Sequence, residues 1–150
     1  MPDPHRRVVR DGYDEIADAY LAARPADGAD LIVLDELLAH LPSGSTVLDG
    51  GCGAGVPVMS RLRERGHHTV GLDFSSRQLQ LARTRVPGAQ LVHGDLGALP
   101  FRSNRLDAIV SFYAVIHVPR TDHPAILREF HRVLRPGGLA LVCLGAHDVP

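Results

Sequence analysis

The stretch Thr46-Val47-Leu48-Asp49-Gly50-Gly51-Cys52-Gly53-Ala54-Gly55 decides the fold. It begins as a short apolar strand and ends in a glycine-rich turn. Glycines let a backbone turn sharply and approach a ligand closely. The residues that follow, among them Val58, Met59 and Leu62, predict a helix, and free N–H groups at a helix start attract negatively charged groups. The stretch therefore predicts a strand–turn–helix unit that holds a ligand at its turn.

Apolar runs alternate with amphipathic segments over the rest of the chain. Two helices are predicted first, over residues 9–20 and 31–41, with Pro25 closing the first. Further helices are predicted over 58–66, 76–86 and 121–134. Strands are predicted at 46–49, 69–73, 90–93, 106–112 and 139–144. Strands that alternate with helices indicate an α/β fold with a mostly parallel sheet.

Length and charge restrict the class of protein. The 150 residues, 45% of them hydrophobic, fit a single domain, with N-terminal cap helices in residues 1–42 and a ligand-binding core in residues 45–145. The 16 basic and 17 acidic side chains argue against a nucleic-acid or anionic-membrane binder. No apolar run approaches the ~18 residues of a bilayer span, and no secretory signal opens the chain. We therefore expect a cytoplasmic protein.

Residue counts exclude several chemistries. All basic residues are Arg, so the chain lacks the lysine of phosphate-loop NTPases, protein kinases and pyridoxal enzymes. Cys52 and Cys143 are too far apart for a redox pair and are expected to be small buried hydrophobes. The histidines have no metal-binding spacing, so no metal site is predicted.

The glycine spacing discriminates between ligands. A dinucleotide fingerprint needs a third glycine where this chain has Val56, which disfavours NAD. The pattern Gly51-x-Gly53-x-Gly55 after Asp49 instead resembles motif I of class I S-adenosylmethionine-dependent methyltransferases. Four later segments resemble that family in order, as does Tyr13-Asp14-x-x-Ala17-x-x-Tyr20 near the N-terminus. They are Val70-Gly71-Leu72-Asp73-Phe74-Ser75, Gly94-Asp95-Leu96-Gly97-Ala98-Leu99-Pro100-Phe101, Asp107-Ala108-Ile109-Val110-Ser111 and Arg132-Val133-Leu134-Arg135-Pro136-Gly137-Gly138.

The resemblance implies a Rossmann-like sheet of strand order 3-2-1-4-5 that binds S-adenosylmethionine. Asp73 would accept hydrogen bonds from the ribose hydroxyls, Asp95 would contact the adenine amino group, and Phe74 and Leu96 would enclose the adenine ring. Each residue also has an ordinary alternative role. Asp73 could cap the next helix, and Asp95 could be a solvated turn residue. Phe74 and Leu96 could belong to the core. The full set expected at the cofactor is Asp49, Gly50, Gly51, Cys52, Gly53, Gly55, Asp73, Phe74, Asp95, Leu96 and Ser111.

The cofactor carries the reactive methyl group, so the enzyme has mainly to orient a nucleophile and exclude water. A hydroxyl acceptor can also require a general base. His117, just past the fourth strand, is the candidate base, although a packing role is the alternative. Tyr13, Tyr20 and Tyr113 are candidates for lining the pocket of a small-molecule substrate.

One departure from the family concerns the C-terminal side of the sheet. The family adds an antiparallel hairpin after strand five, and this chain has no segment for it. We therefore expect an exposed apolar edge at residues 139–144 and self-association through it. Two alternatives to a methyltransferase stay open: a self-associating fragment that binds the cofactor without activity, and, more remotely, an NAD-dependent oxidoreductase.

Overall fold

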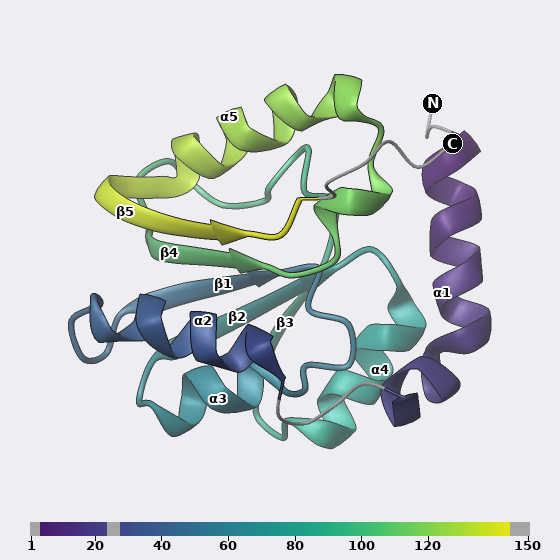
Figure 1. Ribbon diagram of the computed structural model, residues 1–150. Coiled ribbons are helices and arrows are strands. Elements are labelled where there is room, and N and C mark those ends of the chain that lie inside the picture. The colour runs from purple at the N-terminus through teal and green to yellow at the C-terminus, as the bar shows by residue number, and fades with distance from the viewer. Residues whose placement is uncertain (1–3, 24–27, 145–150) are drawn as a thin grey trace.

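The computed structural model describes residues 4–23 and 28–144, which form one parallel sheet flanked by helices (Figure 1). The strands are β1 (Thr46–Gly50), β2 (His68–Asp73), β3 (Gln90–His93), β4 (Leu106–Ser111) and β5 (Leu134–Val142). The sheet order is β3-β2-β1-β4-β5, and every neighbouring pair is parallel. The predicted fold class and strand order are confirmed.

The helices are α1 (Pro4–Ala23), α2 (Ala29–Ala39), α3 (Val58–Glu64), α4 (Ser76–Arg85) and α5 (His123–Val133), with short 3-10 turns η1 (Val115–His117) and η2 (Arg120–Asp122). Local signals explain the starts of α4 and α5. Ser75 caps α4 by accepting a hydrogen bond from the Gln78 backbone N–H at 3.1 Å, and Pro124 lies in the first turn of α5. Pro25, expected to close the first helix, lies outside the described residues.

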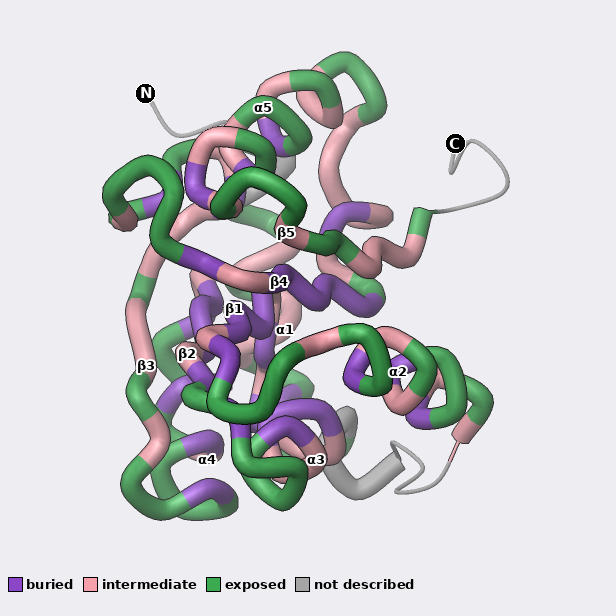
Figure 2. The backbone as a smooth tube through the Cα atoms, turned by 90° about the vertical axis from the view of Figure 1, so that its left-hand side faces the viewer, coloured by how far each residue is buried: buried purple, intermediate pink, exposed green. Residues whose placement is uncertain are grey.

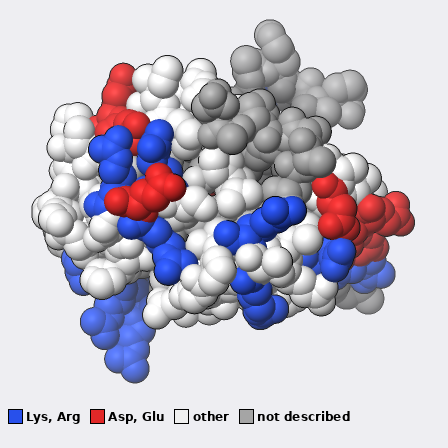
Figure 3. All heavy atoms as spheres, turned by 90° about the horizontal axis from the view of Figure 1, so that it is seen from below, with Lys and Arg blue, Asp and Glu red and all other residues white. Residues whose placement is uncertain are grey.

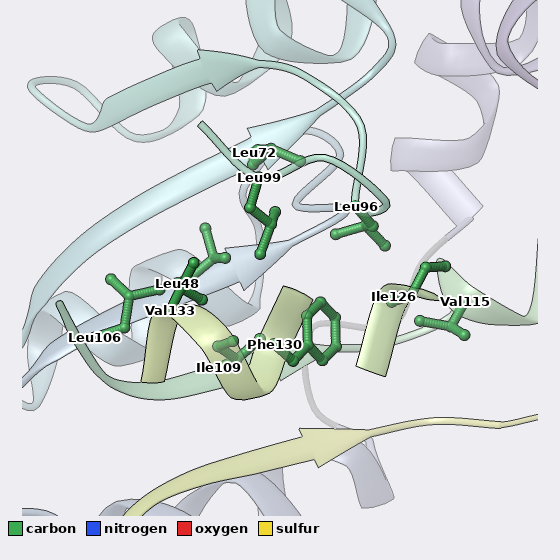
Figure 4. Close-up of a cluster of buried hydrophobic side chains, with 10 residues drawn as sticks. All are labelled: Leu48, Leu72, Leu96, Leu99, Leu106, Ile109, Val115, Ile126, Phe130 and Val133. Carbon is green, nitrogen blue, oxygen red and sulfur yellow. The ribbon is translucent and has the colours of Figure 1, made fainter. Parts of the chain in front are cut away.

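Alternation along the strands divides the core between the two faces of the sheet. Leu48 and Ile109 face α5, where they join Ile126 and Phe130 in the cluster drawn in Figure 4. Their neighbours on the same strands, including Val47, face α2 and α3. Successive strand residues point to opposite faces, so β1 and β4 are buried on both sides, as the purple centre of Figure 2 shows.

The start of the last strand corrects a prediction. The sequence suggested a turn over residues 135–138 and a strand only from 139. Instead β5 begins at Leu134, directly after α5, because Leu134 pairs with Leu106 of β4. The segment up to Gly138 is accommodated as a bulge between that pair and the pair Ala108–Leu139. The Pro136 it contains is tolerated because β5 is an edge strand.

Candidate functional site

The glycine turn after β1 lies at the carboxyl end of the sheet, where β1 and β2 meet. The backbone N–H groups of Gly51 and Cys52 both donate to the Leu72 carbonyl, at 2.7 and 2.9 Å. Gly51 has φ of 77°, and Gly53 has φ of 53°. A side chain is strained in this left-handed region, so the turn depends on glycine. A Cβ atom at Gly51 would also overlap the Cβ of Ala114.

A pocket opens beside this turn and encloses about 790 Å³ of space, part of it continuous with solvent. Nine of the predicted site residues line it, and they come from five separate parts of the chain: Tyr13, Gly51, Gly53, Asp73, Phe74, Asp95, Leu96, Tyr113 and His117.

Asp73 ends β2 at the floor of the pocket and is 7% exposed. Its two carboxylate oxygens accept from the backbone N–H groups of Gly53 at 2.8 Å and Ser75 at 2.9 Å. Burial raises the pKa of Asp73, and the nearby charge of Asp14 raises it further, whereas the backbone hydrogen bonds oppose the shift. Asp73 thus combines the helix-capping contact with a position in the pocket.

Asp95, Leu96 and Phe74 line another part of the pocket. Asp95 follows β3, and its Oδ1 atom accepts from the Gly97 backbone N–H at 2.7 Å, which holds the turn in place. Leu96 is buried, whereas Phe74 is half-buried. The three side chains therefore supply one acid and two apolar surfaces to the same cavity.

An ion pair on α5 braces the segment that follows Leu96. Glu129 accepts from the Leu99 backbone N–H at 2.8 Å, and Arg132 donates to the carbonyls of Leu99 and Phe101 at 3.0 and 2.8 Å. Glu129 and Arg132 also bond each other, and this partner lowers the pKa of Glu129. These hydrogen bonds fix the segment from Leu99 to Phe101 against α5.

Tyr13 and His117 meet across the pocket. The Tyr13 hydroxyl lies 2.6 Å from His117 Nε2, and the two rings contact edge to face with centroids 5.3 Å apart. Tyr13 comes from α1 and His117 from η1, so a hydrogen bond joins the N-terminal helix to the segment after β4. The hydroxyl donates when the histidine proton is on Nδ1.

The other predicted tyrosines differ in their placement. Tyr113 lines the pocket, has φ of 56°, and donates its hydroxyl hydrogen to Asp30 on α2 at 2.9 Å. Tyr20 lies on α1, but its side chain is outside the described part of the structure.

Five residues expected at the cofactor are not among the residues that line the pocket: Asp49, Gly50, Cys52, Gly55 and Ser111. Ser111 donates to the Gly50 carbonyl at 2.8 Å and ties β4 to β1. A Cβ atom at Gly55 would lie 2.9 Å from Val86, so this glycine permits close packing against α4. Cys52 is 3% exposed, and burial raises the pKa of its thiol.

The sequence reasoning missed seven residues that line the pocket: Val9, Leu72, Gln78, Gly94, Phe112, Ala114 and Val118. Most are apolar or glycine and resemble core in a sequence. Gln78 is different, because it is polar and 2% exposed. Its spacing of four residues from the buried Ala82 places it on the inward face of α4, a signal that was present in the sequence.

Two negative findings hold for the described residues. They contain no group of three or more His, Cys, Asp or Glu side chains placed to hold a metal ion. None of the helices in the described ranges has the length and apolar character needed to cross a membrane.

Comparisons with known proteins agree on one family. Residues 47–138 match the model of a methyltransferase domain. The chain is 37% identical over 110 residues to a demethylmenaquinone methyltransferase of Staphylococcus saprophyticus, an alignment that covers 70% of this chain and 46% of the relative. It is 34% identical over 110 residues to a probable S-adenosylmethionine-dependent methyltransferase of Mycolicibacterium smegmatis, covering 73% and 42%.

A solved structure has the same fold. The TehB-like S-adenosylmethionine-dependent methyltransferase of Corynebacterium glutamicum superimposes with a TM-score of 0.73 at 27% identity, covering 93% of this chain and 74% of that one. The chain spans about half the length of the two curated relatives above.

Proposed function

We propose that this chain, which belongs to the S-adenosylmethionine-dependent methyltransferase family, transfers a methyl group from that cofactor to a small-molecule acceptor. The observation that carries the proposal is the composition of one pocket. The glycine turn at Gly51 and Gly53 and the acids Asp73 and Asp95 share it with the hydrogen-bonded pair of Tyr13 and His117.

The residues present fit the cofactor. It offers a ribose diol, an adenine ring and a charged amino-acid end, and the pocket offers matching groups. Asp73 would accept from the diol and Asp95 from the adenine amino group, with Phe74 and Leu96 on the adenine faces. The buried amide of Gln78, without a hydrogen-bond partner among the described residues, adds a donor and an acceptor that suit a polar ligand.

The expected cofactor residues that do not line the pocket would act by positioning. Asp49 is 3% exposed at the end of the central strand, and its charge would attract the cationic end of the cofactor through the glycine turn. Gly50, Cys52, Gly55 and Ser111 would hold that turn against β4 and α4. We propose this division of roles together with the division into cap helices (residues 1–42) and cofactor-binding core (residues 45–145).

When bound, S-adenosylmethionine supplies an electrophilic methyl group on a sulfonium. The chain's own residues would then orient the acceptor and keep water out, and α1 supports this because Val9 and Tyr13 place it over the pocket. Orientation of this kind can lower a barrier by ~7–11 kcal/mol. His117 Nε2 would take the proton of a hydroxyl acceptor that replaces the Tyr13 hydroxyl at this nitrogen, while the edge-to-face contact with the Tyr13 ring keeps the imidazole in position.

The acceptor is proposed to be a small molecule with an apolar, aromatic part. Val9, Phe112, Tyr113 and Val118 provide apolar surface beside His117. Demethylmenaquinone, the compound named for the Staphylococcus saprophyticus relative, is therefore the first acceptor to assay. The mixed charge of the surface, where acidic and basic side chains adjoin on the face in Figure 3, supports this choice over nucleic acid. A cytoplasmic location belongs to the same proposal.

The test has two steps. Isothermal titration should detect binding of S-adenosylhomocysteine and none of NADH. Transfer of a tritiated methyl group from the cofactor is then measured with reduced demethylmenaquinone and with simple phenols, amines and thiols as acceptors. Binding without transfer to any acceptor would favour the alternative of an inactive cofactor-binding fragment, and binding of NADH alone would favour an oxidoreductase.

The role of His117 has its own prediction. With a reactive acceptor, His117→Ala should lower kcat by about 10²-fold or more, since a general base typically contributes that much. The dissociation constant of S-adenosylhomocysteine should stay the same, because no cofactor contact is removed. Tyr13→Phe keeps the ring contact and loses the hydroxyl, so it should give a smaller decrease. An unchanged kcat of His117→Ala at saturating acceptor would eliminate His117 as the base.

Self-association through the edge of β5 is part of the proposal. In the described residues β5 pairs only with β4, and Leu139 is 37% exposed there. An apolar strand edge is a template for pairing with another chain. Light scattering at high concentration should show a dimer or larger species that Leu139→Arg abolishes. Leu127→Arg, at an exposed leucine on α5, is the matched control and should leave the mass unchanged. A monomeric wild-type chain would refute the proposal.

A further inference from the structure

Gln78 lies in the first turn of α4, directly against the pocket. It is 2% exposed and lines the cavity together with Gly53 and Asp73. Neither its Oε1 nor its Nε2 atom has a hydrogen-bond partner among the described residues. Buried amides in folded proteins are normally bonded, and this side chain has two donors and two acceptor sites to satisfy.

The polar groups around Gln78 are engaged with one another. Asp73 accepts from the N–H groups of Gly53 and Ser75. The Ser75 hydroxyl donates to Asp14 and accepts from the Gln78 backbone N–H. The Gln78 side chain is therefore left out of a network that otherwise surrounds it, although its own backbone takes part.

The amide lies in the same corner of the pocket as the Asp73 carboxylate. A Cβ atom built on Gly53 would be 3.5 Å from Gln78 Oε1, and the N–H of the same glycine donates to Asp73 Oδ2 at 2.8 Å. A ligand group that binds Asp73 beside Gly53 would therefore lie close to the Gln78 carboxamide. Because Gly53 has no side chain, no Cβ atom occupies the space beside Gln78 Oε1.

We infer that Gln78 is a specificity-determining residue that hydrogen-bonds the ribose diol of the cofactor beside Asp73. The inference rests on the proposed cofactor pocket. An ionised carboxylate only accepts, so Asp73 satisfies the hydrogens of the two hydroxyls and leaves their oxygens without donors. Gln78 Nε2 supplies that missing donor, and Oε1 offers a further acceptor.

The experiment compares two glutamines on one helix. Gln78→Met keeps the length of the buried side chain and removes the amide. Gln80→Met makes the same change at an exposed position of α4. Isothermal titration measures binding of S-adenosylhomocysteine and of its 2′-deoxy and 3′-deoxy analogues, and urea unfolding measures the stability of the ligand-free proteins.

Gln78→Met should weaken binding of S-adenosylhomocysteine by about 10-fold, which is ~1.4 kcal/mol. It should leave the ligand-free stability unchanged or raised, since an apolar group replaces an unpaired buried amide. In the wild type, at least one deoxy analogue should bind more weakly than S-adenosylhomocysteine. This difference in affinity should be smaller in Gln78→Met, because the variant already lacks the partner of the missing hydroxyl. Gln80→Met should change none of these values.

Three outcomes would overturn the inference. Equal affinity of wild type and Gln78→Met would show that the amide does not contact the ligand. A joint loss of stability and affinity, with unchanged penalties for both deoxy analogues, would assign Gln78 a structural role. A wild-type chain that does not bind S-adenosylhomocysteine would refute the proposed pocket itself, which separates that failure from the first two.

Discussion

The conformation of Gly51 couples the turn after β1 to the segment after β4. Its positive φ reverses the chain, and the absence of a side chain lets Ala114 approach its Cα. Ala114 and Gly51 both line the pocket. One residue therefore determines both the path of the turn and the width of the pocket at this point.

Gly51→Ala should unfold more easily and bind S-adenosylhomocysteine at least 10-fold more weakly. The left-handed backbone costs a side chain ~1–2 kcal/mol, and the overlap with Ala114 adds to that cost. Gly66→Ala is the matched control, because φ is 81° there and a Cβ atom would meet nothing within 4 Å. It should show the backbone cost in urea unfolding and bind normally. Equal binding by both variants would contradict the proposed role of the turn.

At the scale of elements, polar contacts join α1 to α4. The Asp14 carboxylate accepts from the Ser75 hydroxyl and from the Arg77 backbone N–H, and Asp18 pairs with the Arg77 guanidinium at 2.9 Å. Ile16 on the same helix is 51% exposed. Tyr13 belongs to α1 and lines the pocket, so these contacts help to hold α1 in place over it.

Asp14→Ala should loosen α1. The half-buried contact with Ser75 is worth ~1 kcal/mol, so hydrogen exchange of the α1 amides should accelerate about fivefold. Asp18→Ala makes the same change on the same helix, but the pair it breaks is exposed and contributes little. Its exchange should stay close to that of the wild type. Similar acceleration in both variants would mean that the two acids hold α1 equally.

At the scale of the whole molecule, Asp107 joins three strands. From β4 it accepts from the Thr46 backbone N–H of β1 at 2.7 Å and from Arg135 of β5 at 2.6 Å. The Thr46 N–H lowers the pKa of Asp107, Arg135 lowers it further, and burial partly opposes the shift. Arg135 lies in the bulge of β5, between the residues that pair with Leu106 and Ala108 of β4. The bulge therefore lies beside Asp107, which is the β4 residue between those two.

Asp107→Asn should destabilise the protein by about 1 kcal/mol at neutral pH. A carboxyl whose pKa is lower in the folded state contributes stability above its unfolded pKa, near 3.9, and loses it as the pH falls through the folded value. Urea unfolding should therefore show a difference between wild type and variant at pH 7 that shrinks below about pH 4. A difference independent of pH would indicate that the charge of Asp107 does not matter.

Much of the architecture follows from local sequence. Apolar runs and the glycine, serine and proline signals between them are short-range effects, so the mostly parallel sheet could be anticipated from them, whereas its strand order was implied by the family resemblance. Gly51, Gly53, Asp73 and Asp95 could be expected at one edge because parallel strands end on the same side of a sheet. The start of β5 was misjudged, since pairing with β4 overrides the local tendency of Pro136 and Gly137 to turn. The first helix also begins earlier than predicted, at Pro4.

The sequence by itself determined the fold class and the family, because both rest on short motifs that follow one another in a fixed order along the chain. The tertiary structure alone decided that Tyr13 reaches His117 across 104 positions and that Gln78 is buried without a partner in the described residues. It also buried Asp49 and Ser111 outside the pocket lining. Such outcomes depend on how segments that are far apart in the sequence pack against one another, and a local sequence pattern does not encode that packing.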